Sequence, residues 1–285
     1  MAVGENPIEL PVGVFMILRD IIRDRIGVFF EDSNRDLLAS KLSERLRSLG
    51  LRSFLDYFYL LKYGPGTDEE WDCLTDALSV QETYFWREMN QIRALVDVFV
   101  PRHVAAGRGP VRIWSAACAT GEEPLTIAMA LAEDGWFDRA DIEIWASDTS
   151  PAALEKANRG IYRERSFRAL PLSLRERYFT AVDGGWRVDP RLLSRIRYSR
   201  ANLLDSAETR NFATAPFVFC RNVFIYFSAQ TVTRVVSQFA ERMPYPGYLF
   251  LGVSESLFRA KTAFELEEIG GAFVYAKRAA SLGES

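Results

Sequence analysis

The stretch from Arg112 to Ala130 constrains the fold of this chain more than any other. It reads RIWSAACATGEEPLTIAMA, so an apolar strand runs into a turn of small residues, and the turn opens a helix. That order places a ligand site at the carboxyl end of a strand in an open α/β sheet. The turn holds one glycine, Gly121, where a dinucleotide-binding turn needs three for its backbone to approach a pyrophosphate.

Two carboxylates stand at the start of this helix. Glu122 and Glu123 lie where a bound phosphate would have to lie, and they would repel it. They would attract a cation instead. This favours S-adenosylmethionine, a metabolite with a ribose, an adenine, an ammonium and a sulfonium but no phosphate. The alternative is that both acids only complement the helix dipole in the first turn.

Composition limits the class of protein. With 285 residues, of which 48% are hydrophobic, the chain can form one large domain or two of ordinary size. Its net charge of -3 argues against general nucleic-acid binding. The apolar run from Val12 to Leu18 is too short to cross a bilayer, which takes about 20 residues. We therefore expect no membrane insertion and a cytoplasmic location.

Residues that serve acid–base and metal chemistry are scarce. Cys73, Cys118 and Cys220 are widely spaced and odd in number, which supports neither a disulfide framework nor a zinc site. His103 is the only histidine. The chemistry of this chain should therefore need no metal and little proton transfer.

Two kinds of periodicity divide the chain. From Val14 to Leu78 apolar residues recur at helical spacing. After Gly109 strand-like and helix-like segments alternate, which predicts a parallel sheet flanked by helices. We expect a helical N-terminal domain with its linker over residues 1–90. An α/β domain should follow over residues 91–285 and finish in an antiparallel hairpin between residues 264 and 278.

One region interrupts the alternation. Between Leu170 and Tyr198 two strand-like pieces flank a turn made of Asp183, Gly184 and Gly185. This pattern predicts a small inserted antiparallel β subdomain. The wider region over residues 159–200 holds eleven arginines against four acids. This excess predicts either a solvated face or a docking surface for an acidic macromolecule.

Polar residues follow three of the expected strands. Asp148 ends one of them, at the position where open α/β sheets place an acid for both ribose hydroxyls. Asn202 and Leu203 follow another, where an amide and an apolar side chain could bind the edge and face of an adenine. Arg221 and Asn222 follow the third, at the usual place for reacting groups.

Six strings of residues resemble, in order and spacing, the CheR-type chemotaxis receptor methyltransferases. The strings are SVQETYFWRE from Ser79, WSAACATGEEP from Trp114, ASD from Ala146, NLLD from Asn202, CRNVFIYF from Cys220 and GVSES from Gly252. The resemblance implies a Rossmann-like class I methyltransferase sheet with an inserted β subdomain and an N-terminal α-helical domain. It also implies methylation of glutamates on the cytoplasmic helices of a chemoreceptor, with S-adenosylhomocysteine as the other product.

The resemblance also implies roles for single residues. By motif position, Glu123 would meet the methionine ammonium, Asp148 the ribose, and Asn202 with Leu203 the adenine. Arg87, Asn222 and Tyr226 would lie around the methyl-transfer centre. The other implied cofactor contacts, beside Arg87 and Asn222, are Gln81, Thr83, Ala117 and Arg221.

The chain departs from the family pattern at several positions. Gln81 stands where the family usually has asparagine, Trp86 where it has phenylalanine, and Val253 where it has a small residue or histidine. We expect these changes to tune the site without abolishing it. The hairpin over residues 179–187 is short, which resembles the branch that does not bind a pentapeptide tail of the receptor. A basic stripe of Lys41, Arg45 and Arg52 is then the candidate receptor-docking face.

Two other functions stay open at this point. One is a cofactor-binding scaffold that has lost transfer activity, against which the intact Arg87, Asn222 and Tyr226 speak. The other is a methyltransferase for small molecules or nucleic acid. A nucleic-acid enzyme would favour an acidic-proline-aromatic string after the fourth strand, and none stands there. A glutamate acceptor agrees with the scarcity of bases, because its carboxylate is already ionised at pH 7. The oligomeric state is not predicted.

Overall fold

The computed structural model describes residues 8–278, which divide into two compact units. The helical unit comprises the chain up to Val80 together with Tyr226–Ser228. The α/β unit comprises the rest, from Gln81 to Ile225 and from Ala229 onward. Each unit buries its own hydrophobic cluster. None of the helices in the described residues is both long and apolar enough to cross a membrane.

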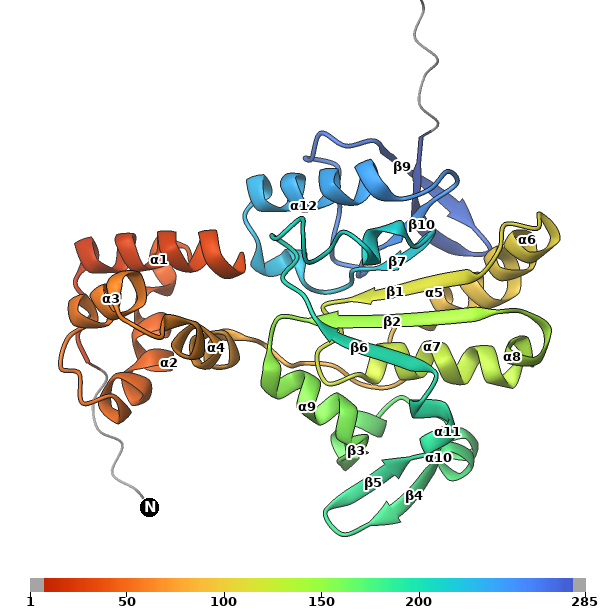
Figure 1. The fold of residues 1–285 in the computed structure, drawn as a ribbon, viewed down its shortest axis with the longest axis horizontal. Coiled ribbons are helices and arrows are strands. Elements are labelled where there is room, and N and C mark those ends of the chain that lie inside the picture. The colour runs from red at the N-terminus through yellow and green to blue at the C-terminus, as the bar shows by residue number, and fades with distance from the viewer. Residues whose placement is uncertain (1–7, 279–285) are drawn as a thin grey trace, which may run out of the picture. The chain divides into compact units, whose positions relative to one another are not determined.

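The helical unit packs four helices, α1 (Val12–Ile26), α2 (Arg35–Ser48), α3 (Phe54–Tyr63) and α4 (Thr67–Leu78) (Figure 1). Local signals set their ends. Gly27 adopts a φ of 85° after α1, a left-handed conformation that glycine adopts at low cost. The side chain of Ser53 accepts the Asp56 N–H at the start of α3. Phe15, Leu18 and other apolar side chains spaced along the helices fill the core.

A mixed seven-stranded sheet forms the centre of the α/β unit. Its order is β6-β2-β1-β7-β8-β10-β9, parallel except for β10, which runs antiparallel to both neighbours. The strands are β1 (Val111–Ala116), β2 (Ile142–Asp148), β6 (Ile196–Arg200), β7 (Phe217–Phe219), β8 (Tyr248–Phe250), β9 (Phe264–Ile269) and β10 (Ala272–Lys277). The predicted Rossmann-like sheet and C-terminal antiparallel hairpin are therefore confirmed.

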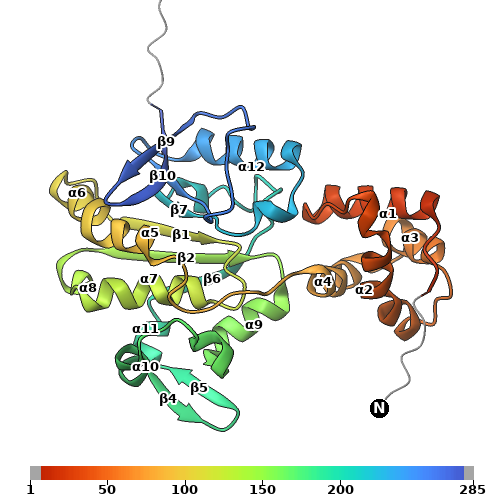
Figure 2. The same cartoon turned by 180° about the vertical axis from the view of Figure 1, so that it is seen from behind.

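Helices and short turns connect the strands (Figures 1 and 2). The helices are α5 (Met89–Ala94), α6 (Val100–Ala105), α7 (Glu122–Glu133), α8 (Trp136–Arg139), α9 (Pro151–Arg159), α10 (Leu172–Tyr178), α11 (Pro190–Leu193) and α12 (Ala229–Arg242). Contacts join α7 and α9 to β2 and β6, and α6 to β1. The carboxyl ends of β1, β2 and β7 thus lie along one edge of the sheet, as parallel pairing requires.

The inserted subdomain is a three-stranded antiparallel sheet in the order β3-β5-β4. Its strands are β3 (Ile161–Tyr162), β4 (Phe179–Val182) and β5 (Gly185–Val188). The insertion therefore begins at residue 161, before the start predicted at residue 170. Its predicted end at Tyr198 also differs, because β6 pairs with β2 in the main sheet, with Ile196 opposite Ile144.

The two units meet in the sequence at residue 80, whereas the predicted boundary is residue 90. The reason is the ring of Phe85, which is fully buried in the core of the α/β unit. Its centroid lies 4.8 Å from that of Tyr162 and 5.0 Å from that of Phe179. This single aromatic ties the segment after Val80 to the inserted sheet.

Candidate functional site

The loop after β1 has an unusual backbone. Ala117, Ala119 and Gly121 have φ values of 57°, 48° and 92°, and the two alanines are strained there because only glycine adopts such angles freely. A Cβ on Gly121 would lie 2.8 Å from the Tyr198 hydroxyl, so no larger residue fits. Strain of this kind persists only where surrounding contacts hold it, and it is common at ligand sites.

Asp148 supplies one of those contacts. Its Oδ2 accepts the Ala119 N–H at 2.8 Å and its Oδ1 accepts the Ser150 N–H at 2.9 Å. The Cys118 N–H also donates to the Ser147 carbonyl, which joins the loop to the end of β2. Asp148 therefore joins the loop after β1 to the start of the turn that follows β2.

Glu122 and Glu123 are adjacent in the chain but have different surroundings. Glu122 is 2% exposed, and its carboxylate accepts the hydroxyls of Thr120 at 2.6 Å and Ser166 at 2.9 Å. The Glu123 carboxylate accepts the Ser115 hydroxyl at 2.6 Å. Burial raises the pKa of both carboxyls. A cation opposes the rise at each carboxyl: Arg221 lowers the pKa of Glu123, and Arg165 more weakly lowers that of Glu122.

Arg221 is the cation at the centre of this site. Its side chain is 2% exposed, with Nε 3.4 Å from Glu123 Oε2 and Nη2 3.5 Å from Glu88 Oε2. Nη2 also donates to the Arg87 carbonyl at 2.8 Å. Nη1 is buried and has no hydrogen-bond partner within residues 8–278. A buried guanidinium with an unused donor beside a carboxylate suits a zwitterion: the carboxylate of an amino acid on Arg221 and its ammonium on Glu123.

Asn222 lies next to this pair, at the start of the loop that follows β7. It has a φ of 60°, and its N–H donates to Glu255 Oε2 at 2.7 Å. Glu255 also accepts the N–H groups of Gly252, Phe224 and Ile225. A Cβ on Gly252 would lie 2.4 Å from Asn222 Nδ2, so the glycine leaves room for that amide. Glu255 and Gly252 together determine the position of Asn222.

The residues assigned to an adenine lie at the end of β6. The side-chain oxygen of Asn202 accepts the Leu204 N–H at 3.0 Å, and the Asn202 N–H donates to Glu208 at 2.8 Å. Leu203 is 5% exposed. In this turn the Asn202 amide is held by a local hydrogen bond, and the neighbouring Leu203 is buried.

The segment before α5 carries Gln81, Thr83 and Arg87, all half-buried. Gln81 accepts the Lys156 ammonium at 3.1 Å through its side-chain oxygen. Arg87 donates to the Glu82 carbonyl at 2.9 Å, and its guanidinium carbon lies 5.5 Å from the centre of the Tyr84 ring. The Arg221 contact with the Arg87 carbonyl joins this segment to the loop after β7.

Tyr226 and the predicted docking residues belong to the helical unit. The Tyr226 carbonyl accepts the Phe29 N–H at 2.8 Å, and Phe227 forms an isolated antiparallel bridge with Val28. Arg45 forms an ion pair with Glu70, which is 7% exposed and also accepts the Tyr57 hydroxyl. Lys41 reaches the Ala77 carbonyl at 3.5 Å, and Arg52 is exposed. Arg45 therefore has an internal structural role that the sequence did not predict.

Three polar side chains of the site were not singled out from the sequence: Ser115, Glu88 and Glu255. Glu88 pairs with Arg221 and accepts the Val253 N–H at 3.2 Å. Glu88 ends the string SVQETYFWRE, and Glu255 lies within the string GVSES, both of which the sequence did single out. Their place in those strings was the available signal, but it did not say which group each one contacts.

Comparison with known proteins identifies the family. Residues 14–79 match the model of the CheR methyltransferase all-alpha domain, and residues 81–272 match that of the CheR methyltransferase SAM-binding domain. Chemotaxis protein methyltransferase 2 of Vibrio cholerae is 35% identical, over 92% of this chain and 92% of its own. Chemotaxis protein methyltransferase of Escherichia coli is 35% identical, over 92% of this chain and 90% of its own.

A relative with another biological role also matches. The probable biofilm formation methyltransferase WspC of Pseudomonas putida is 33% identical over 90% of this chain, which spans 60% of that longer protein. Two family models together cover most of the chain in the order that the two units have here. The chain belongs to the CheR methyltransferase family and is an S-adenosylmethionine-dependent methyltransferase.

Proposed function

We propose that this protein methylates glutamate side chains on the cytoplasmic helices of chemoreceptors and so forms glutamyl methyl esters and S-adenosylhomocysteine. The observation that carries the proposal is the Glu123–Arg221 pair, in which a half-buried carboxylate lies 3.4 Å from a buried guanidinium that has an unused donor. Both residues lie in the region that matches the CheR SAM-binding domain. The relatives are named chemotaxis protein methyltransferases, which supports a chemotaxis protein as the substrate. We take that substrate to be the receptor and place the reaction in the cytoplasm.

The residues present fit S-adenosylmethionine. We assign the methionine ammonium to Glu123, its carboxylate to Arg221, the ribose to Asp148 and the adenine to Asn202 with Leu203. Arg87, Asn222, Gln81 and Thr83 complete the proposed cofactor contacts, and the backbone at Ala117 borders them. When bound, S-adenosylmethionine supplies an electrophilic methyl group on a positively charged sulfur.

The chain's own residues then have a limited task. The acceptor glutamate is ionised at neutral pH, so no side chain has to remove a proton from it. One glutamate oxygen forms the bond to the methyl carbon, the carbon–sulfur bond breaks, and its electron pair stays on sulfur. We assign Arg87, Asn222 and Tyr226 to orienting the acceptor carboxylate. In favourable intramolecular cases orientation contributes about 7–11 kcal/mol to lowering a barrier.

We further propose that the receptor docks on the helical unit through Lys41 and Arg52, with Arg45 contributing where its contact with Glu70 allows. In this proposal the β subdomain does not bind a receptor tail, as in the pentapeptide-independent branch. Calorimetry with a receptor tail peptide tests that part. A micromolar dissociation constant would contradict it.

The decisive experiment is transfer from methyl-labelled S-adenosylmethionine to a panel of receptor cytoplasmic fragments, followed by mild base that releases methanol from esters. Base-labile label on a receptor fragment is the expected result. A protein that binds S-adenosylhomocysteine tightly but transfers no label would act as a binding module instead. E123Q should lose both methyl transfer and S-adenosylhomocysteine binding while it keeps wild-type thermal stability. That outcome would assign both properties to the proposed site.

A further inference from the structure

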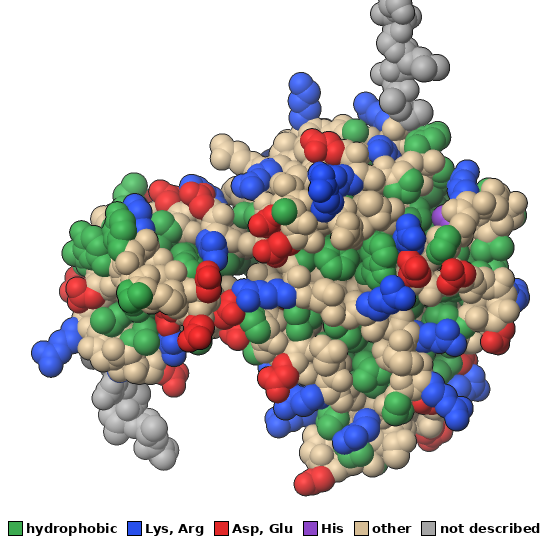
Figure 3. Space-filling model, viewed as in Figure 1, with side chains coloured by type: hydrophobic (Ala, Val, Ile, Leu, Met, Phe, Trp, Pro, Cys, Tyr) green, Lys and Arg blue, Asp and Glu red, His purple; other side chains and the backbone are tan. Residues whose placement is uncertain are grey.

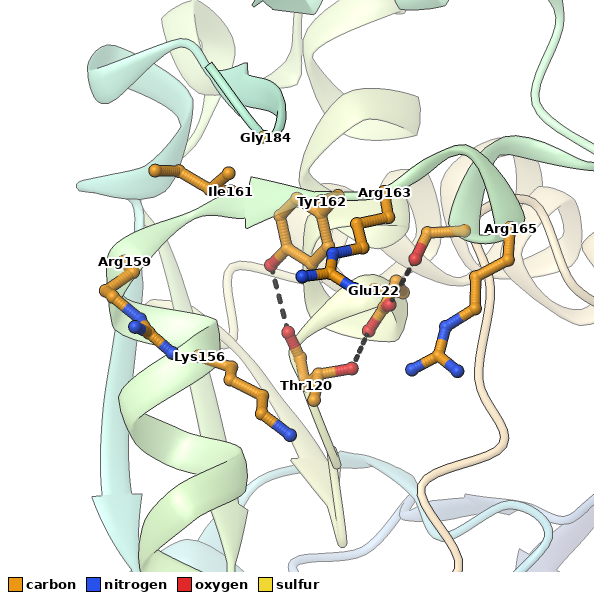
Figure 4. A pocket seen from close by; sticks show the side chains of 10 residues that line it. Thr120, Glu122, Lys156, Arg159, Ile161, Tyr162, Arg163, Arg165 and Gly184 are labelled. Atoms are coloured by element: carbon orange, nitrogen blue, oxygen red, sulfur yellow. Dashed lines mark hydrogen bonds between the residues drawn. The ribbon is translucent and has the colours of Figure 1, made fainter. Parts of the chain in front are cut away.

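A basic pocket of about 430 Å³ lies in the α/β unit, apart from the Glu123–Arg221 pair (Figure 4). It opens where α9 and β3 approach the loop after β1. Lys156 and Arg159 come from α9, and Arg163 and Arg165 follow β3. Figure 4 shows Lys156 and Arg165 extending on either side of the Thr120–Glu122 hydrogen bond.

The four cations of this pocket face a single acid in its lining. The acid that lines it is Glu122, which is buried and already accepts the hydroxyls of Thr120 and Ser166. Burial also raises the pKa of Glu122, which weakens it as a counter-ion. The pocket therefore carries a local excess of positive charge.

The partners of the four cations confirm that excess. Lys156 donates to the neutral side chain of Gln81, and Arg159 lies 3.9 Å from Glu155 on its own helix. Within the described part of the chain, neither Arg163 nor Arg165 forms a salt bridge or a side-chain hydrogen bond, although the charge of Arg165 lowers the pKa of Glu82 and opposes the rise in that of Glu122. Neighbouring arginines differ, since Arg168, Arg175 and Arg177 each pair with a glutamate.

The place of the pocket relates it to the transfer site. Thr120 lines it and belongs to the strained loop that Asp148 holds through Ala119. Lys156 contacts Gln81, which is a proposed cofactor contact. Figure 3 shows several Lys and Arg side chains on the nearby surface over β4, β5, α10 and α11. A macromolecule that brings a glutamate to the cofactor would thus pass close to these cations.

We propose that this pocket receives acidic side chains of the protein substrate, namely carboxylates that lie within two helical turns of the methylated glutamate. The inference rests on the proposed function. Arginine binds carboxylates through a planar fork, and the two unpaired guanidiniums offer two such forks. Acids three or four residues apart on a helix lie about 5–6 Å apart on one face, so a helical substrate can present two of them together. The pocket then contributes to the choice of glutamate.

The test compares two charge-reversal pairs in methylation kinetics with one receptor fragment. R163E/R165E reverses the pocket, and R210E/R242E makes the same change of net charge at exposed arginines that do not line it. R163E/R165E should raise the KM for the fragment at least tenfold, with kcat and the Kd for S-adenosylhomocysteine within twofold of wild type. R210E/R242E should stay within twofold throughout. The neutral pair R163Q/R165Q should raise KM less than the reversal does.

A second arm identifies the partner group. Fragments in which single acids near the methylated glutamate are replaced by lysine should include one that R163E/R165E methylates better than wild type does. The proposal is overturned if KM is unchanged, or if the control pair raises it equally. It is also overturned if pyrophosphate inhibits wild type but not R163E/R165E while KM is the same for both, since the pocket would then serve a small anion. Failure of the wild-type protein to methylate any fragment would instead contradict the proposed function.

Discussion

The carboxylate of Glu255 accepts the backbone N–H of Asn222 at 2.7 Å and so holds the strained loop that follows β7. The same carboxylate accepts the N–H of Gly252 at 2.7 Å, so one side chain joins the ends of β7 and β8. Burial raises the pKa of Glu255, and its four backbone donors oppose that rise. Asn222 owes its position to a residue thirty-three places further along the chain.

Replacing Glu255 should therefore impair transfer more than cofactor binding. E255Q turns an amide N–H toward backbone donors, and we expect kcat to fall about tenfold to a hundredfold, or about 1.4–2.7 kcal/mol. E255A should also lower the free energy of unfolding by about 3 kcal/mol, because a buried donor without an acceptor costs about 1–3 kcal/mol. Steady-state kinetics and thermal unfolding measure both effects. E268Q, at an exposed acid of β9, is the control and should match wild type.

Gly252 should tolerate no side chain. In G252A the new Cβ would lie 2.4 Å from Asn222 Nδ2, so the amide must move. We expect a fall in kcat of at least tenfold in the methyl-transfer assay. G13A places a methyl group in open space on α1 and should be neutral or slightly stabilising, since alanine favours a helix over glycine by about 1 kcal/mol. Unchanged kcat in G252A would show that the position of Asn222 is unimportant for transfer.

Cofactor affinity should fall as the pH is lowered, and the fall should begin at a higher pH than it would if Glu123 were an exposed glutamate. Glu123 must be ionised to bind an ammonium, and burial raises its pKa, so it protonates earlier as the pH falls. Because the pKa of Glu123 is raised in the folded protein, its protonation stabilises the folded state. Titration of Glu123 therefore cannot weaken cofactor binding by unfolding the protein. Calorimetry with S-adenosylhomocysteine between pH 5 and about 8 checks this. E123Q should bind weakly and without that pH dependence; an E123Q profile that still follows wild type would place the titrating group elsewhere.

Arg45 should behave differently from the other docking candidates. R45A removes the partner of a nearly buried carboxylate, Glu70, and should lower the free energy of unfolding by about 1–3 kcal/mol. R52A removes an exposed charge and should leave thermal stability unchanged while it raises the KM for the receptor. Calorimetric unfolding separates the two effects. Equal melting temperatures for R45A and wild type would contradict a structural role for the Arg45–Glu70 pair.

Much of the architecture could be predicted from the sequence, since it depends on local patterns. The alternation after Gly109 predicted the sheet because a strand and its crossover helix each leave a periodic apolar signature. The ligand site after β1 and the acid at the end of β2 were predicted because open α/β sheets place such groups at the carboxyl ends of their strands. The motif strings named most of the residues that the structure describes around that edge.

Only the tertiary structure decided which residues far apart in the chain contact one another. The pairing of β6 with β2 depends on which strand edge is available, and Phe85 joins the α/β unit because its ring finds three aromatic neighbours there. Arg45 and Glu70, Arg221 and Glu88, and Asn222 and Glu255 are ordinary charged or polar residues in a sequence. Hydrophobic periodicity places each on an element, but the folded packing alone determines which opposite charge or donor it meets.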